Sequence, residues 1–265
     1  MKLLVSYPFW LIIISVLCII LERLRPWRTS QRFLRPQLLQ DYFWLLFNGV
    51  FSSSLLTPIL VLIYAGFAKM FFAATGLSPH HVGIIAPYPL AVQIIILIII
   101  ADCIEWCVHN LLHRVPWLWR IHRVHHSITT MDWIGNFRFH WGETLIYSAV
   151  KYLPLFMLGA TWQAVFVVAV VATLIGHLNH ANLNISWGPL RYVLNSSRMH
   201  IWHHEKHVRG KAGVNFGVVF SFWDWIFGTA YMPKTGADQP VVIGFQGMHK
   251  VSGSLIKRFF VPFLD

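Results

Sequence analysis

The sequence has few charged residues. Only 12% of its 265 residues are charged, and Asp and Glu together number 10. A soluble domain usually carries about 25% charged residues. Hydrophobic residues make up 56% of the chain, and its mean hydropathy is +0.57. This composition argues against a soluble globular core and indicates that much of the surface faces lipid.

Cysteine is also scarce. The three cysteines, Cys18, Cys103 and Cys107, all lie in apolar stretches, and none forms a pair with a two-residue gap. The sequence therefore indicates neither a cysteine metal site nor a disulfide framework. We expect all three to be small buried hydrophobic residues.

Internal repeats, low-complexity segments and linkers are absent, which predicts one membrane domain over residues 1–265. The expected fold class is all-α: an integral membrane helical bundle with about four transmembrane segments and a cytosolic helical cap. The expected parts are a mainly transmembrane anchor (1–108), a histidine-rich catalytic cap (109–143 and 177–231), a membrane hairpin (144–176) and a C-terminal interfacial tail (232–265).

Four apolar runs, at about 3–21, 41–72, 89–108 and 145–175, are candidates for the membrane segments. The first has the length of a spanning helix and lacks a small-residue cleavage site, so we interpret it as a retained helix rather than a signal peptide. The fourth is broken at Pro154 and Gly159. It predicts a hairpin of two helices, because its second part alone is short for a straight span.

The charges predict an orientation. The net charge is +11, and five arginines follow the first apolar run: Arg23, Arg25, Arg28, Arg32 and Arg35. Clustered basic residues favour the cytoplasmic side of a membrane. The loop at 73–88 is then outside, with His80 and His81, which we exclude from any shared site. No motif of a nucleic-acid-binding fold accompanies the positive charge, so nucleic-acid binding is not expected.

Histidine is abundant, with 15 residues, most of them in short clusters. The clustered residues are His109 and His113, His122, His125 and His126, His177 and His180, and His200, His203 and His204. Residues three or four apart share one helix face and can bind one ion together. In the two HxxHH segments we expect the first and second histidines to share a face and the third to point about 100° away from its neighbour. One segment could then serve two neighbouring metals.

The clusters supply nine or ten candidate ligands, depending on whether His177 is a direct ligand. A single zinc site needs only about three or four protein ligands. The count therefore favours two ions of higher coordination, each with an open position. Imidazole suits iron, zinc, copper and nickel; we favour iron because a lipid setting suggests oxidation of unreactive carbon. His140, His207 and His249 are expected to be supporting or surface residues.

Carboxylates near these ligands could orient them. Ligating histidines need an acceptor on the other ring nitrogen. Asp102 and Glu105 precede His109 by seven and four residues on one helix face, which makes both candidates for that role.

The ordered motifs resemble the fatty acid hydroxylase/sterol desaturase superfamily of histidine-rich membrane oxidases, over roughly residues 102–231. The matching segments are DCIEWCVHNLLH, LWRIHRVHHS, FRFHWGE, NHAN, RMHIWHH, NFG and FWDWIFGTAY. Trp106 and Asn110 depart from the family's Tyr and Arg.

The resemblance implies a non-haem di-iron oxidase: two iron ions (Fe2+/Fe3+) held by the histidines, with O2 as co-substrate. It favours His180 as a ligand and adds Asn182 and Asp224 as supporting residues. Its product would be a hydroxylated or desaturated lipid, from a sterol-like, fatty acyl or polar lipid of the bilayer. An external donor, cytochrome b5-like or a ferredoxin with its reductase, would supply electrons. The site would face the cytoplasm, in a bacterial inner membrane.

Two rival interpretations remain. A non-enzymatic histidine-rich metal-binding or transport protein would place its ligands near the bilayer midplane, whereas these clusters follow the ends of apolar runs. A membrane cytochrome would not need adjacent His-His pairs. The motifs do not separate hydroxylase from desaturase.

Overall fold

A computed structural model describes residues 6–79, 82–233, 240, 242–250 and 253–261. Within these residues the fold is helical, with three isolated β-bridges and no strand. Four helical stretches are long and apolar enough to cross a membrane: Tyr7–Leu24 (α1), Leu38–Thr75, Leu90–Arg114 (α4) and Trp162–His180 (α7). The prediction of a helical bundle with about four transmembrane segments is confirmed.

The second span is one continuous helical stretch with a wider turn inside it. Helix α2 (Leu38–Leu46) passes through a π-helical segment, η2 (Phe47–Phe51), into α3 (Ser52–Thr75). Such π segments often occur at functional sites. Asn48 lies in this segment, and its amide donates to the carbonyls of Phe137 and Phe139 at 3.0 and 2.8 Å. The irregular turn therefore fastens this span to the cap.

Two successive helices, α6 (Trp141–Met157) and α7, occupy the residues of the predicted hairpin. Gly159 adopts a φ of +79°, and a Cβ there would lie 2.8 Å from the Gly83 backbone. The expectation that the second arm is too short for a straight span was wrong. Helix α7 begins at Trp162 and continues through His180, for 19 residues, because the polar segment GHLNH extends the apolar run.

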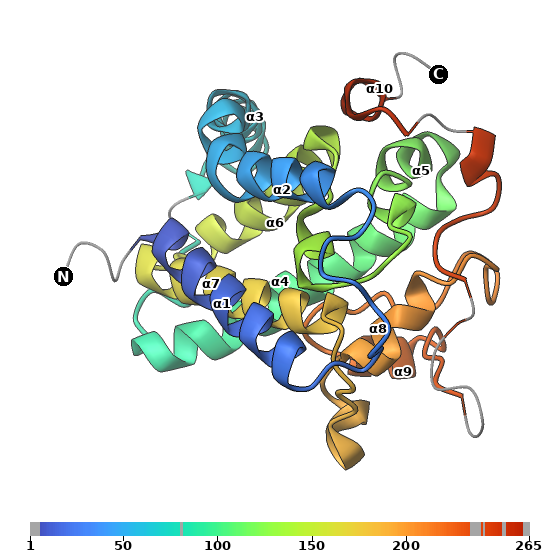
Figure 1. The fold of residues 1–265 in the computed structure, drawn as a ribbon. Coiled ribbons are helices and arrows are strands. Elements are labelled where there is room, and N and C mark those ends of the chain that lie inside the picture. The colour runs from blue at the N-terminus through green and yellow to red at the C-terminus, as the bar shows by residue number, and fades with distance from the viewer. Residues whose placement is uncertain (1–5, 80–81, 234–239, 241, 251–252, 262–265) are drawn as a thin grey trace.

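Short helices form the cap at the end of the bundle where α1, α4 and α7 terminate (Figure 1). They are α5 (Pro116–His122), η4 (His125–Ser127), η5 (Trp133–Phe137), η6 (Gly188–Tyr192), α8 (Ser197–His203), α9 (Phe222–Ile226), η7 (Met248–Lys250) and α10 (Leu255–Phe259). Phe259 of α10 stacks on Trp44 of α2. The division into anchor, cap, hairpin and interfacial tail stays a prediction.

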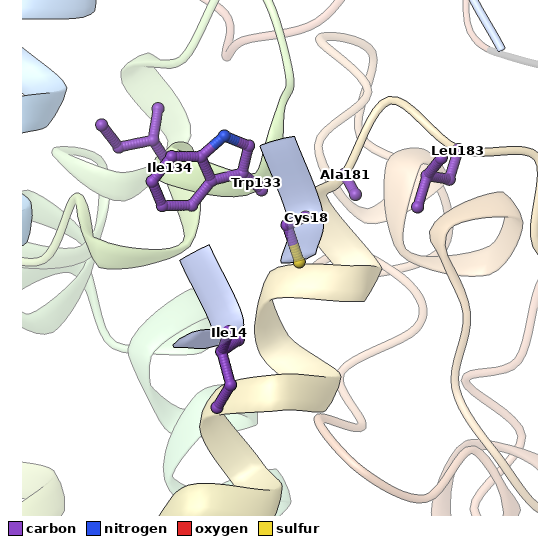
Figure 2. Close-up of a cluster of buried hydrophobic side chains, with 6 residues drawn as sticks. All are labelled: Ile14, Cys18, Trp133, Ile134, Ala181 and Leu183. Atoms are coloured by element: carbon purple, nitrogen blue, oxygen red, sulfur yellow. The ribbon is translucent and has the colours of Figure 1, made fainter. Parts of the chain in front are cut away.

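A buried apolar cluster joins the cap to the spans (Figure 2). Ile14 and Cys18 of α1 meet Trp133 and Ile134 of η5, and Ala181 and Leu183 after α7 complete the cluster. Burial of such side chains contributes roughly 1.5–3 kcal/mol each for the larger ones. The end of α1 is thereby fixed against the segment that leads into the histidines.

A buried ion network ties the first loop to the cap. The Arg35 guanidinium pairs with Asp132 and Asp41, and the Arg138 guanidinium pairs with Asp41. Arg35, Asp41 and Arg138 are at most 6% exposed. Arg35 therefore has a structural role. Arg23, Arg25 and Arg32, in contrast, are exposed.

The three cysteines are free, and their environments differ. Cys18 is fully buried in the apolar cluster, but Cys107 is exposed on α4, so the expectation of burial was wrong for Cys107. An apolar helix face that meets lipid does not need to be covered by protein. His80 and His81, expected on the opposite side, lie outside the described residues.

We predict that Asp41→Asn destabilises the protein strongly. Loss of this carboxylate leaves two buried guanidinium groups without a full counter-charge, which costs about 3–5 kcal/mol. Thermal unfolding in detergent measures the effect. Glu205→Gln is the control, because its partner Arg209 is partly exposed; that change should cost less than about 1 kcal/mol. Equal losses in the two variants would show that the buried network does not anchor the loop.

Candidate metal centre

Nine histidines converge in two groups. His109, His113, His122, His126 and His203 form the five-histidine group, and His125, His180, His200 and His204 form the four-histidine group. Within each group the potential ligand atoms lie within 4.8 Å of one another. All except His113 are buried. The residues come from the ends of α4 and α7, from α5 and η4, and from α8 and the residue that follows it.

Each HxxHH segment contributes to both groups, as the spacing predicts, but the pairing differs from the expectation. His122 joins His126, while His200 joins His204, so the partners are four residues apart rather than three. Helix α5 ends at His122, and a 3-10 turn carries His125 and His126. Residues four apart lie only about 40° from each other around an α-helix, so the four-residue pairing also places two side chains on one helix face.

Backbone carbonyls fix the rings of the five-histidine group. The Nδ1 atoms of His109 and His203 lie 2.8 Å from the carbonyls of Phe216 and Val214, and His113 Nδ1 lies 3.1 Å from Ala212. A carbonyl only accepts, so each Nδ1 carries the hydrogen. In a neutral ring this leaves the lone pair on Nε2.

These lone pairs point at one another. His109 Nε2 lies 3.2 Å from His122 Nε2, and His113 Nε2 lies 3.1 Å from His126 Nε2. His203 Nε2 is buried and has no hydrogen-bond partner among the described residues. Burial and the neighbouring imidazoles lower the pKa of His203 well below 6.5, which keeps the ring neutral. Converging neutral nitrogens fit a cation, which would accept all their lone pairs at once.

The Nε2 atoms of the four-histidine group also converge, but fewer of its Nδ1 atoms are hydrogen-bonded. His180 Nε2 lies 3.3 Å from both His125 Nε2 and His200 Nε2, and His200 Nε2 lies 3.2 Å from His204 Nε2. His180 Nδ1 donates to the Gly176 carbonyl at 2.9 Å. In the described part of the chain, Nδ1 of the other three has no hydrogen-bond partner.

The loop that supplies the three carbonyls, residues 212–220, is held by two carboxylates. Asp224 accepts from the backbone amides of Phe216 and Gly217 at 2.9 and 2.8 Å. Asp102 accepts from Val219 and Phe220 at 2.7 and 3.0 Å. A Cβ at Gly217 would lie 2.2 Å from the Phe220 carbonyl oxygen, so only glycine fits this turn.

The helix spacing suggested that Asp102 accepts a hydrogen bond from a histidine. Its two oxygens accept from the backbone of the loop instead. Asp224 acts in a similar way, through the Phe216 peptide that orients His109. Trp106, one of the two departures from the family pattern, donates to Asp224 at 3.0 Å. Carboxylates from α4 and from α9 thus fix the backbone of the loop.

Glu105 and Asn182 lie elsewhere. Glu105 forms an ion pair with Lys151 of α6. Asn182 exchanges hydrogen bonds with the Arg28 backbone at 2.8 and 3.1 Å, which fixes the loop after α1. The expected bond from Glu105 to a histidine is not formed, because its carboxylate pairs with Lys151 instead.

His177 is outside both groups. Asn136 lies 3.0 Å from its Nδ1, and Ser15 lies 3.5 Å from its Nε2. His140 caps α6 by accepting from Gly142 N and is bonded to the Phe259 carbonyl at 2.9 Å. His207 and His249 are exposed.

Glu143 is a site residue that the sequence analysis did not single out, although it closes the quoted segment FRFHWGE. Its Oε1 lies 2.8 Å from His122 Nδ1, and it is fully buried in the first turn of α6. Burial raises the pKa of this carboxyl well above 4.5. A cation held by His122 would favour the ionised form.

Comparison with known proteins matches residues 94–229 to the family described as fatty acid hydroxylase. An ornithine lipid hydroxylase of Rhizobium tropici is 32% identical over 66% of this chain and 52% of its own length. Methylsterol monooxygenase 1-1 of Arabidopsis thaliana is 28% identical over 52% of this chain and 46% of its own.

Mouse cholesterol 25-hydroxylase is 25% identical over 52% of this chain and 46% of its own length. The chain thus spans about half the length of these curated relatives. No solved structure matches. The relatives' names agree with the expectation of an oxidoreductase.

We predict different metal contents for His204→Ala and His177→Ala. The first removes a member of the four-histidine group and should lower bound metal from two ions to about one per chain. The second changes a buried histidine outside both groups and should leave two. Elemental analysis of protein that elutes like the wild type in size-exclusion chromatography gives the number of metal ions per chain. Loss of metal from His177→Ala alone would contradict the grouping.

We also predict that the metal-free protein loses stability as the pH falls from about 7 to 5. Burial and neighbouring imidazoles lower the pKa well below 6.5 for His122, His125, His126, His200, His203 and His204. The unfolded chain therefore takes up protons near pH 6.5 that the folded chain does not bind. The free energy of unfolding then decreases, by up to about 2 kcal/mol for each such histidine.

Unfolding midpoints in detergent at pH 7, 6 and 5 measure this dependence. A midpoint that stays constant over the range would mean that the rings accept protons as readily in the folded chain as in the unfolded one.

Proposed function

The chain belongs to the fatty acid hydroxylase family, and from that premise we propose that it is a membrane-bound non-haem di-iron oxidase that uses O2 to hydroxylate a lipid. One observation carries the proposal: nine imidazoles converge in two groups at the end of a bundle of membrane-length helices. So many nitrogens exceed the needs of one tetrahedral zinc ion.

The nine grouped histidines are the proposed ligands, and His177 is not among them. Iron bound there would supply the redox chemistry that inserts one atom of O2 into a C–H bond. The other atom leaves as water, which consumes two electrons and two protons for each alcohol formed. The electrons come from an external carrier, cytochrome b5-like or a ferredoxin.

The chain's own residues hold the ligand rings and exclude water. The carbonyls of residues 212–216 keep Nδ1 protonated and so direct Nε2 inward. Glu143 does the same for His122 and balances part of the metal charge. Phe216, which is fully buried, packs its ring against His109, His113 and His203.

The proposed substrate enters from the bilayer. A small cleft between α4, α6 and α7 is lined by apolar side chains such as Ile98, Leu155 and Val168, together with the Glu105–Lys151 ion pair. Glu105 lies one helical turn before His109. Ionisable side chains at membrane depth are costly and commonly functional. This cleft, with the name of the ornithine lipid hydroxylase, favours a lipid with a polar group near the reacting chain.

We further propose that the protein lies in a bacterial inner membrane with the histidines facing the cytoplasm. Exposed Arg23 in the last turn of α1, with Arg25 and Arg32 after the helix, supports this orientation.

We predict that cells expressing the protein contain a lipid with one additional oxygen, which is absent when His203→Ala replaces it. This substitution removes a ring that points into the five-histidine group. Mass comparison of lipid extracts tests it, with Cys107→Ala as the control because Cys107 is exposed on α4. A lipid lacking two hydrogens would make the enzyme a desaturase, and product formation by His203→Ala would remove this histidine from the centre.

A further inference from the structure

The five-histidine group approaches the surface at one place. Among the nine grouped histidines, only His113 is partly exposed. It lines a pocket on the cap together with Trp119, Trp202, Arg209 and Phe245. In the described part of the chain, the grouped histidines therefore reach the surface only at His113.

Trp119 lies between the surface and the ligands. It is partly exposed, and its ring centroid lies 5.1 Å from that of His113, 5.3 Å from that of His126 and 6.1 Å from that of His122. Tunnelling of electrons weakens steeply with distance. A partner that touches Trp119 and His113 would come as near to the metal ligands as the described surface allows.

Exposed basic residues adjoin the wall of this pocket in the chain. Arg120 follows Trp119, Arg114 follows His113 and Lys211 precedes Ala212 of the pocket wall; all three are exposed. Arg209 lies over the Trp202 ring and pairs with Glu205.

Within the described cap segments 109–143 and 177–231, acidic groups do not offset these cations. The cap segments 109–143 and 177–231 contain four acidic residues: Asp132, Glu143, Glu205 and Asp224. Asp132, Glu143 and Asp224 are buried, and Glu205 is bound to Arg209. The net field at the opening therefore attracts an acidic partner.

We propose that the surface around this pocket is the docking surface of an acidic one-electron carrier protein. Arg209 lies in the pocket wall, and the exposed Arg114, Arg120 and Lys211 adjoin wall residues in the chain; these four basic residues are called the rim. The inference rests on the proposed function, because only a redox centre needs such a partner. In each encounter the carrier is oxidised by one electron and the metal centre is reduced by one, with no bond formed or broken. Two encounters supply the electrons for one hydroxylation.

The test uses the full-length protein in lipid nanodiscs and a plant-type [2Fe–2S] ferredoxin as the acidic probe. Arg120→Glu and Lys211→Glu should each weaken ferredoxin binding about tenfold at low ionic strength. Arg191→Glu is the matched control: it makes the same charge change on the cap, outside the pocket, and should leave the affinity within about twofold. The difference should shrink as salt rises, because exposed charges are screened.

Binding is measured with metal-free protein as well, so the result does not depend on turnover. Reduction by ferredoxin should slow in the rim variants, whereas lipid hydroxylation driven by dithionite should not change. Equal affinities for the rim variants, the control and the wild type, or no salt-sensitive binding, would overturn the docking surface. Absence of any dithionite-driven product would instead contradict the proposed function.

Discussion

The structure depends on burying nine neutral imidazoles with their lone pairs turned towards one another. Without a cation this arrangement is repulsive and unsatisfied, since a buried polar group without a partner costs about 1–3 kcal/mol. The chain offsets that cost with rigid support. Carbonyls of one loop hold three rings, Asp102 and Asp224 hold the loop, and Asn215 fastens it to the Met199 and Tyr231 carbonyls. The cap thus holds these nitrogens in an arrangement that fits a cation.

Buried polar contacts join the membrane spans to the cap. Buried Asp41 at the start of α2 joins Arg35 and Arg138, and the π-helical turn at Asn48 binds the segment that leads into α6. Glu22 at the end of α1 accepts from the amides of Trp133 and Asn182 at 3.0 and 2.7 Å. Helix ends leave backbone groups unsatisfied, and here charged side chains of the spans bind the backbone of the cap. Ligands from α4, α7 and α8 can therefore meet at fixed positions.

Long apolar runs and clustered histidines were enough to predict the helical bundle and the residues that converge, because both signals are carried by side chains at short spacing. The split into two groups was harder, because His122 shares a helix face with residues three and four positions later, and spacing alone does not say whether His125 or His126 joins it. The groups that orient the ligand rings were largely missed from the sequence. The acceptors are backbone carbonyls, which have no side-chain signature, and Asp102 acts through a loop 117 residues later in the chain. Glu143 could have been found from its place in FRFHWGE.

The most direct test of two adjacent metal sites is anomalous diffraction at the iron absorption edge from crystals of the iron-loaded protein. Two peaks are expected, one among His109, His113, His122, His126 and His203 and one among His125, His180, His200 and His204. A single peak, or two peaks that include His177 as a ligand, would contradict the arrangement described here.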